Sequence, residues 1–259
     1  MAQPRVMVLR APGTNCDRET AFAFELAGGT VERIHINRLL EQPDIVQRFE
    51  ILCIPGGFSY GDDVAAGRIL ASQIRRHLGQ TMSDFKDAGK LILGICNGFQ
   101  VLIKSGILLE EKENAAAATL TWNDSGRYED RWVHLSAEDN NCVFLRGVER
   151  LYLPVAHAEG KFVPTSEESL QQLARGGQLP LRYTNSNLAT NGEVCFPANP
   201  NGSVGNVAGV CDRSGRVLGL MPHPERHIDP THHPRWTREG LKEEGDGLAI
   251  FRNAINYFD

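Results

Sequence analysis

The chain has 259 residues, of which 41% are hydrophobic and 23% charged, and its formal net charge is −5. This length and composition are typical of a globular protein, and we expect one domain over residues 1–259. The acidic balance offers no basic face for nucleic acid. The sequence has neither a signal-like apolar start nor an apolar run of membrane length. We therefore expect a cytoplasmic protein without a nucleic-acid or membrane partner.

The first half of the chain alternates short apolar runs with helical patterns, and Gly or Pro closes most of them. Strands linked by helices in this way predict βαβ units and a parallel sheet covered on both faces. We expect strands at residues 5–10, 31–36, 51–54 and 90–95, and helices at 17–26, from 62 or 63 to about 78, at 82–88, and from the end of the fourth strand to about 106.

The second half has shorter strand candidates, separated by turns rich in Gly, Asn and Pro. This pattern predicts an antiparallel or mixed extension of the sheet, followed by an exposed polar insertion near residues 229–245 and an amphipathic helix over 246–258. The fold class is therefore α/β, with an open, mostly parallel sheet flanked by helices. The strand candidates are residues 132–135, 151–156, 180–183, 206–211 and 216–220.

Six cysteines stand at positions 16, 53, 96, 142, 195 and 211, and no two form a C-x-x-C pair. A chain of this size can fold without disulfides, so we interpret them as reduced thiols. The function of each is therefore decided by its local sequence.

Cys96 has the most informative surroundings. It follows the apolar residues 91–93 in the segment G-I-C-N-G-F-Q, with Gly94 and Gly98 on either side. G-x-C-x-G is the cysteine form of the nucleophile elbow, a strained turn between a strand and a helix. The helix N-terminus favours a thiolate, and the free N–H groups of the turn suit an oxyanion. The alternative is a buried structural cysteine.

A cysteine nucleophile needs a base and a group that orients the base. His223 and Glu225, in M-P-H-P-E-R, follow another apolar strand and are two residues apart. In an extended segment their side chains point the same way, so Glu225 can accept from one imidazole nitrogen while the other faces the thiol. The alternative is a rigid surface turn.

Two further segments bear on ligands. The loop P-G-G-F-S-Y-G-D at residues 55–62 matches no nucleotide-binding motif, but its backbone N–H groups could face a carbonyl oxygen. The histidines at 223, 227, 232 and 233 have a spacing that matches no standard zinc pattern, so we expect no metal site.

Taken together, these three motifs resemble the class I glutamine amidotransferases, and more narrowly the glutaminase subunits of phosphoribosylformylglycinamidine synthases. The likeness runs in order through nearly the whole chain, and it implies a flavodoxin-like core. Four further segments share it: A-P-G-T-N-C-D at 11–17, L-P-V-A-H-A-E-G at 153–160, N-P-N-G-S at 199–203 and I-F-R-N-A at 250–254.

The resemblance implies that Cys96 attacks the side-chain amide of glutamine, which releases ammonia and leaves a γ-glutamyl thioester for water to hydrolyse. His223 would act as base and acid, and Glu225 would orient it. The N–H of Asn97 and an N–H of Gly56 or Gly57 would form the oxyanion hole. The glutamine pocket would be lined by Gln100, His157, Glu159 and Gly160.

The resemblance also implies that the ammonia passes to a separate synthetase subunit, which converts formylglycinamide ribonucleotide to its amidine in purine biosynthesis. ATP and Mg²⁺ are expected in that partner and no cofactor in this chain. A third small subunit is left open.

One departure from the subfamily pattern A-H-G-E-G is Ala158, which stands where a glycine is usual. A methyl group there would narrow the pocket, or be tolerated if φ is negative. Two other functions compete: a stand-alone cysteine hydrolase of γ-glutamyl or peptide bonds, and a catalytically idle regulatory module. A screen of glutamine against peptides separates the first from an amidotransferase, and the loss of function of Cys96→Ala separates the second.

Overall fold

The computed structural model describes residues 3–109, 117–138, 140–185 and 194–259. Most of its strands belong to one large sheet, and two form a separate two-stranded sheet. The strands are β1 (Arg5–Arg10), β2 (Thr30–His35), β3 (Ile51–Ile54), β4 (Leu91–Ile95), β5 (Ala118–Thr121), β6 (Glu129–Ala137), β7 (Arg150–His157), β8 (Lys161–Pro164), β9 (Leu181–Thr184), β10 (Val207–Cys211) and β11 (Val217–Leu220).

The large sheet has nine strands in the order β2-β1-β3-β4-β11-β10-β9-β6-β7. The five strands from β2 to β11 are parallel to their neighbours, and every pairing from β11 to β7 is antiparallel. Strands β5 and β8 pair antiparallel beside it. This arrangement confirms the predicted mostly parallel sheet with an antiparallel extension.

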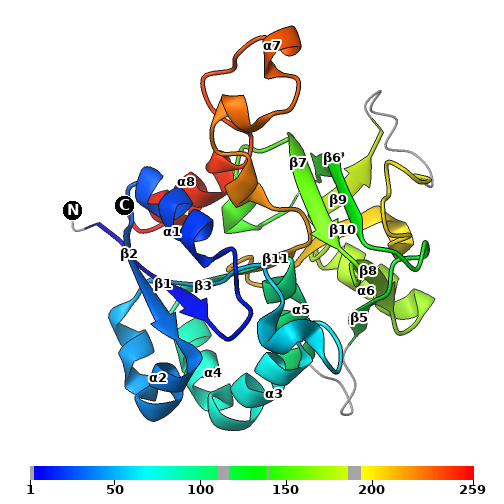
Figure 1. Ribbon diagram of the computed structural model, residues 1–259. Coiled ribbons are helices and arrows are strands. Elements are labelled where there is room, and N and C mark those ends of the chain that lie inside the picture. Colours follow the sequence, from blue (N-terminus) through cyan, green and yellow to red (C-terminus); the bar gives the residue numbers. More distant parts are fainter. Residues whose placement is uncertain (1–2, 110–116, 139, 186–193) are drawn as a thin grey trace.

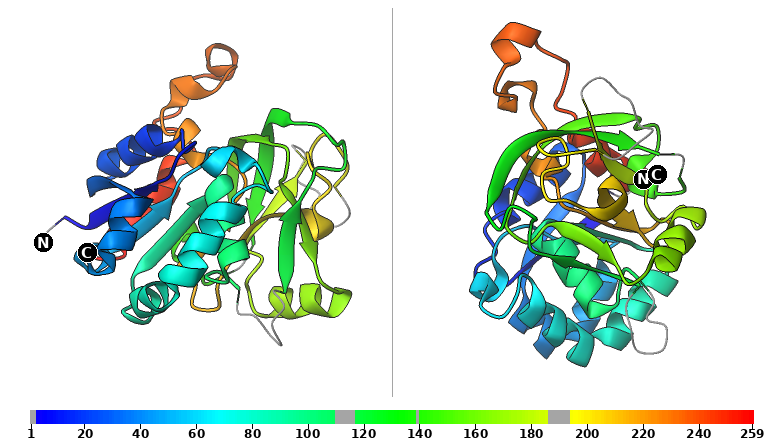
Figure 2. Two further views of the ribbon diagram at one scale, coloured as in Figure 1. Left: turned by 60° about the horizontal axis from the view of Figure 1, so that its bottom comes forward. Right: turned by 90° about the vertical axis from the view of Figure 1, so that its right-hand side faces the viewer.

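Helices cover both faces of the parallel half (Figure 1). On one face α1 and α8 lie together, with the rings of Phe24 and Phe251 4.9 Å apart between centroids. On the other face lie α3, α4 and α5, as both figures show (Figures 1 and 2). The helices are α1 (Asp17–Leu26), α2 (Ile36–Glu41), α3 (Arg68–His77), α4 (Gly79–Asp87), α5 (Asn97–Ser105), α6 (Glu167–Arg175), α7 (Trp236–Glu239) and α8 (Leu248–Asn256).

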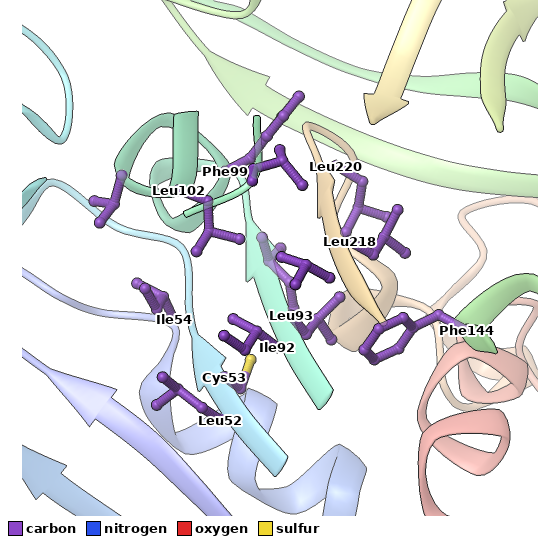
Figure 3. Packing of buried hydrophobic residues seen from close by; sticks show 14 of the residues in the cluster. Leu52, Cys53, Ile54, Ile92, Leu93, Phe99, Leu102, Phe144, Leu218 and Leu220 are labelled. Atoms are coloured by element: carbon purple, nitrogen blue, oxygen red, sulfur yellow. The ribbon is translucent and has the colours of Figure 1, made fainter. Parts of the chain in front are cut away.

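The core lies between the central strands and α5 (Figure 3). Every residue of β3, β4 and β11 is buried, as expected for parallel strands covered on both faces. This packing fixes the carboxyl ends of three neighbouring strands relative to one another. The labelled side chains are Leu52, Cys53, Ile54, Ile92, Leu93, Phe99, Leu102, Phe144, Leu218 and Leu220.

The helix expected from residue 62 or 63 begins later, at Arg68. Tyr60, Gly61 and Asp62 have φ values of 56°, 72° and 56°, and Gly67 has 72°. Left-handed residues interrupt a right-handed helix, so residues 59–67 form a 3₁₀ turn and a loop in front of α3. Helices α2 and α6 and the β5–β8 pair were not predicted.

Residues 229–245 project away from the sheet beyond α8, seen in orange in Figures 1 and 2. Most of these residues are exposed, but His233 is buried, with its ring 5.2 Å from that of Trp132. Within the described ranges, no helix is long and apolar enough to cross a membrane.

Candidate active site

The candidate residues gather where three parallel strands end. β3, β4 and β11 are hydrogen-bonded neighbours in the sheet, and the segments containing Gly56, Cys96 and His223 follow them directly. The carboxyl edge of an open α/β sheet is where ligands bind. The topology therefore brings together three motifs that are far apart in the sequence.

Cys96 sits in a strained turn between β4 and α5. Its φ of 50° and ψ of −104° are rare for a residue with a side chain. The Cys96 N–H donates to the Leu220 carbonyl at 2.8 Å. A Cβ on Gly98 would lie 1.8 Å from the Ile54 carbonyl oxygen, so only glycine permits this approach of α5 to β3. The geometry is that of the predicted elbow, with the thiol at the N-terminus of α5.

His223 and Glu225 form a buried pair. His223 Nδ1 lies 2.6 Å from Glu225 Oε1, and both residues are 2% exposed. Because a carboxylate accepts, Nδ1 carries the proton. Nε2 has no hydrogen-bond partner among the described residues, so it is available to a thiol proton. Burial lowers the pKa of His223, but the charges of Glu225 and Cys96 outweigh it and raise that pKa well above its usual range.

The glycine loop lies against the imidazole. A Cβ on Gly56 would be 2.7 Å from His223 Cε1, and Gly57 has a φ of 139°. The Ser59 N–H donates to Asn97 Oδ1 at 3.2 Å, which joins this loop to the elbow. The N–H of Asn97 belongs to the first turn of α5, where no intrahelical acceptor exists. The N–H groups predicted for an oxyanion hole thus come from two connected segments.

Gln100 and Glu159 meet one turn along α5. Gln100 Nε2 donates to the Glu159 carbonyl at 2.6 Å, and Asn97 Nδ2 donates to Gln100 Oε1 at 3.0 Å. The Glu159 carboxylate accepts from the Ala66 N–H at 3.2 Å. This carboxylate therefore holds the loop before α3. A role of Gln100 and Glu159 in binding glutamine stays a prediction.

His157 and Gly160 are held by Asn123, which sequence reasoning missed. Asn123 Oδ1 accepts from the Gly160 N–H at 3.1 Å and lies 3.1 Å from His157 Nδ1. Because that oxygen only accepts, His157 carries its proton on Nδ1. Burial, with the charge of His223, lowers the pKa of His157 to about 3. Ala158, between them, does not have positive φ, so its methyl group causes no backbone strain.

Two other residues beside His223 had no predicted role. The Cys16 thiol contributes to the raised pKa of His223, and Arg226 Nη2 lies 3.2 Å from Cys16 Sγ. Burial, above all, raises the pKa of Cys16. The only sequence signal was the P-G-T-N-C-D segment, which indicated a family but not a contact.

Cys16, His223 and Glu225 could also hold a metal ion, because their ligand atoms all lie within 4.8 Å of one another. The guanidinium of Arg226 beside the Cys16 sulfur places a positive charge there, which disfavours a cation. The charges therefore fit a buried His223–Glu225 pair beside a thiol better than a metal centre.

A mostly parallel sheet with a cysteine elbow at its carboxyl edge is typical of glutamine amidotransferases. The chain belongs to the family described as the CobB/CobQ-like glutamine amidotransferase domain, which matches residues 3–258. The predicted resemblance is thereby confirmed.

The names of individual relatives are more specific than the family description. The chain is 49% identical over 258 residues to the phosphoribosylformylglycinamidine synthase subunit PurQ of Dehalococcoides mccartyi, covering 99% of this chain and 98% of that one. It is 40% identical to the subunit of the same name from Methanococcus maripaludis, with 99% and 98% covered. Among solved structures it is similar to PurLQS from Thermotoga maritima, with a TM-score of 0.75, 31% identity and complete coverage of both chains.

Proposed function

We infer that this chain is the glutaminase subunit of a phosphoribosylformylglycinamidine synthase. It hydrolyses the side-chain amide of glutamine and passes ammonia to a synthetase subunit, which converts formylglycinamide ribonucleotide to formylglycinamidine ribonucleotide in purine biosynthesis. The observation that carries this inference is the 49% identity to a subunit of that enzyme over 99% of the chain, together with a cysteine elbow beside the buried His223–Glu225 pair.

In the proposed reaction, Cys96 Sγ attacks the amide carbon of glutamine. His223 Nε2 takes the thiol proton and then gives a proton to the leaving nitrogen, so that ammonia departs and a γ-glutamyl thioester remains. Water, deprotonated by the same nitrogen, attacks the thioester and releases glutamate and the free thiol. Glu225 holds the imidazole by its 2.6 Å bond to Nδ1 and stabilises the imidazolium that forms in each half-reaction.

The oxyanion of each tetrahedral intermediate is assigned to the N–H of Asn97 and an N–H of Gly56 or Gly57. These donors are fixed before the reaction because the Ser59–Asn97 hydrogen bond joins their two segments. Gln100 and the loop from His157 to Gly160 are proposed to bind the rest of glutamine.

The partner of this chain is the large synthetase subunit. We place ATP and Mg²⁺ in that partner, and no cofactor in this chain, because the glutaminase step transfers only protons and an acyl group. A complex of this kind handles small soluble metabolites, and we propose that it works in the cytoplasm.

The experiment is ammonia release from glutamine by the purified chain, alone and with the synthetase subunit and its substrates. We expect release that rises with the partner and that is lost in Cys96→Ala. The absence of release even in the assembled complex would contradict the proposal. A parallel screen of γ-glutamyl peptides tests the alternative: a stand-alone hydrolase would cleave them without the partner.

A further inference from the structure

A cavity lies between α3, α5 and the segment around β5, outside the candidate active site. Its volume is about 850 Å³, within the range of small-molecule sites. We propose that this cavity binds a small phosphate-bearing anion, and that its arginines recognise the phosphate group. The site goes beyond the proposed function, since no step of glutamine hydrolysis needs it.

The positive charges of the cavity share one face of α3. Arg75 follows Arg68 by seven residues and Arg76 follows it by eight, and this spacing places all three on one side of the helix. Lys104 of α5 adds a fourth cation to the wall. Within the described part of the chain, the guanidinium groups of Arg68 and Arg76 make no hydrogen bond or ion pair. A protein with net charge −5 thus has, over its described ranges, two unpaired guanidinium groups, those of Arg68 and Arg76, at one cavity.

Among the described residues, the cavity is lined by one carboxylate, that of Glu159, which already has hydrogen-bond and ion-pair partners. It accepts from the Ala66 N–H at 3.2 Å and lies 3.8 Å from Lys104 Nζ. Lys104 also donates to the Ala66 carbonyl at 2.5 Å. The arginines therefore give the described lining of the cavity a net positive charge. The planar guanidinium fork suits phosphate, to which it can donate two parallel hydrogen bonds.

The rest of the lining suits a small organic molecule attached to the phosphate. Ser72, Thr119 and Thr165 bring hydroxyl groups to the cavity, and Trp122 stands at its wall with 59% of its surface exposed. Hydroxyls can bond to a sugar, and an exposed indole offers a face for a planar ring. An acidic side chain of a partner protein would satisfy the arginines but would not use the indole. We therefore favour a sugar phosphate or a nucleotide.

The cavity also shares a wall with the candidate active site. Glu159 lines the cavity, and the backbone carbonyl of Glu159 accepts from Gln100, which in turn accepts from Asn97 of the elbow. An anion drawn to Lys104 would compete with Glu159 for that cation. A change in the Lys104–Glu159 ion pair is the route by which a bound anion would affect the elbow.

The test is titration of the full-length chain with AMP, ribose 5-phosphate and adenosine by calorimetry. We expect AMP and ribose 5-phosphate to bind with a Kd below about 1 mM, and adenosine at least tenfold more weakly. The double variant Arg68→Gln, Arg76→Gln should weaken AMP binding at least tenfold. The matched control is Arg18→Gln, Arg38→Gln, which removes the same charge from exposed positions elsewhere and should leave the Kd within twofold.

Four results would overturn the proposal: no binding of either phosphate at 10 mM, adenosine binding as well as AMP, equal weakening by the two double variants, or AMP binding that the assembled complex has lost. The last would show that the partner's own side chains fill the cavity. Because the measurement is of binding rather than turnover, it stands or falls separately from the glutaminase assignment.

Discussion

Glu225→Gln is the sharpest test of how the imidazole of the proposed base His223 is held. The substitution keeps the size of the side chain and a carbonyl oxygen that can accept from His223 Nδ1, but it removes the charge. In the native site that charge acts over 2.6 Å on an imidazole that is 2% exposed. The variant therefore separates the electrostatic contribution of Glu225 from the positioning one.

The size of the effect follows from that contact. A hydrogen bond to a charged group is worth about 1.5–3 kcal/mol, which corresponds to a loss of about 10- to 150-fold in kcat/KM if the imidazolium forms in the transition state. The charge of Glu225 also helps to raise the pKa of His223. Its removal lets the imidazolium lose its proton at lower pH, so the alkaline limb of the pH–rate profile should move to lower pH.

The assay is glutamine-dependent ammonia release by the assembled complex across pH 5–10. Glu243→Gln, which changes an exposed glutamate in the projecting segment, is the matched control. A loss below threefold with an unmoved alkaline limb would refute the role given to Glu225. So would a loss as large as that of Cys96→Ala, because an orienting group contributes less than the nucleophile.

Two further predictions concern the architecture that holds the site. Gly98→Ala should destabilise the fold by about 3 kcal/mol or more in urea unfolding, because its methyl group would lie 1.8 Å from the Ile54 carbonyl oxygen. The control is Gly79→Ala, whose methyl group would meet no atom of another segment within 4 Å, and which should change the free energy of unfolding by about 1 kcal/mol at most. Similar losses of stability in both variants would contradict the close approach of α5 to β3. His157 has its pKa lowered from 6.5 to about 3 by burial, so the unfolded chain binds the extra proton in this range, and stability should fall by about 1.4 kcal/mol per unit as pH drops below 6.5. His157→Asn, which keeps a donor toward Asn123, should flatten that slope in denaturation at pH 4–7, and an unchanged slope would contradict the assignment.

Sequence periodicity was enough to predict the strands of the parallel half of the sheet, because β1, β3 and β4 are apolar runs that end in turns containing or flanked by Gly or Pro. It failed where local conformation broke the pattern. The apolar and polar spacing of residues 62–78 fits one helix, yet left-handed residues at 60–62 and 67 delay α3 to Arg68. Helix α2 has only six residues, too few for a clear period. Helix α6 is as long as α5 and begins at a Ser166 N-cap, so its sequence carried a signal that the prediction overlooked.

The positions of the candidate catalytic residues could be predicted because each follows a strand in its own motif. The carboxyl ends of parallel strands lie at one edge of the sheet, so the sequence placed Cys96 and His223 at the same edge, and the pairing of β4 with β11 makes their segments neighbours. Asn123, Cys16 and Arg226 were not predictable, since their contacts with the site join segments that no local pattern connects. Asn123, for example, reaches His157 across 34 residues, and its own surroundings, T-W-N-D-S, resemble an ordinary turn.

In the proposed function, this chain supplies ammonia and the partner uses it. The most direct test compares Cys96→Ala with the native chain in the assembled complex, measuring formation of formylglycinamidine ribonucleotide with glutamine and, separately, with ammonium chloride. We expect glutamine-dependent synthesis to be abolished in the variant while ammonia-dependent synthesis keeps its native rate. Loss of both activities together, or survival of the glutamine-dependent one, would contradict it.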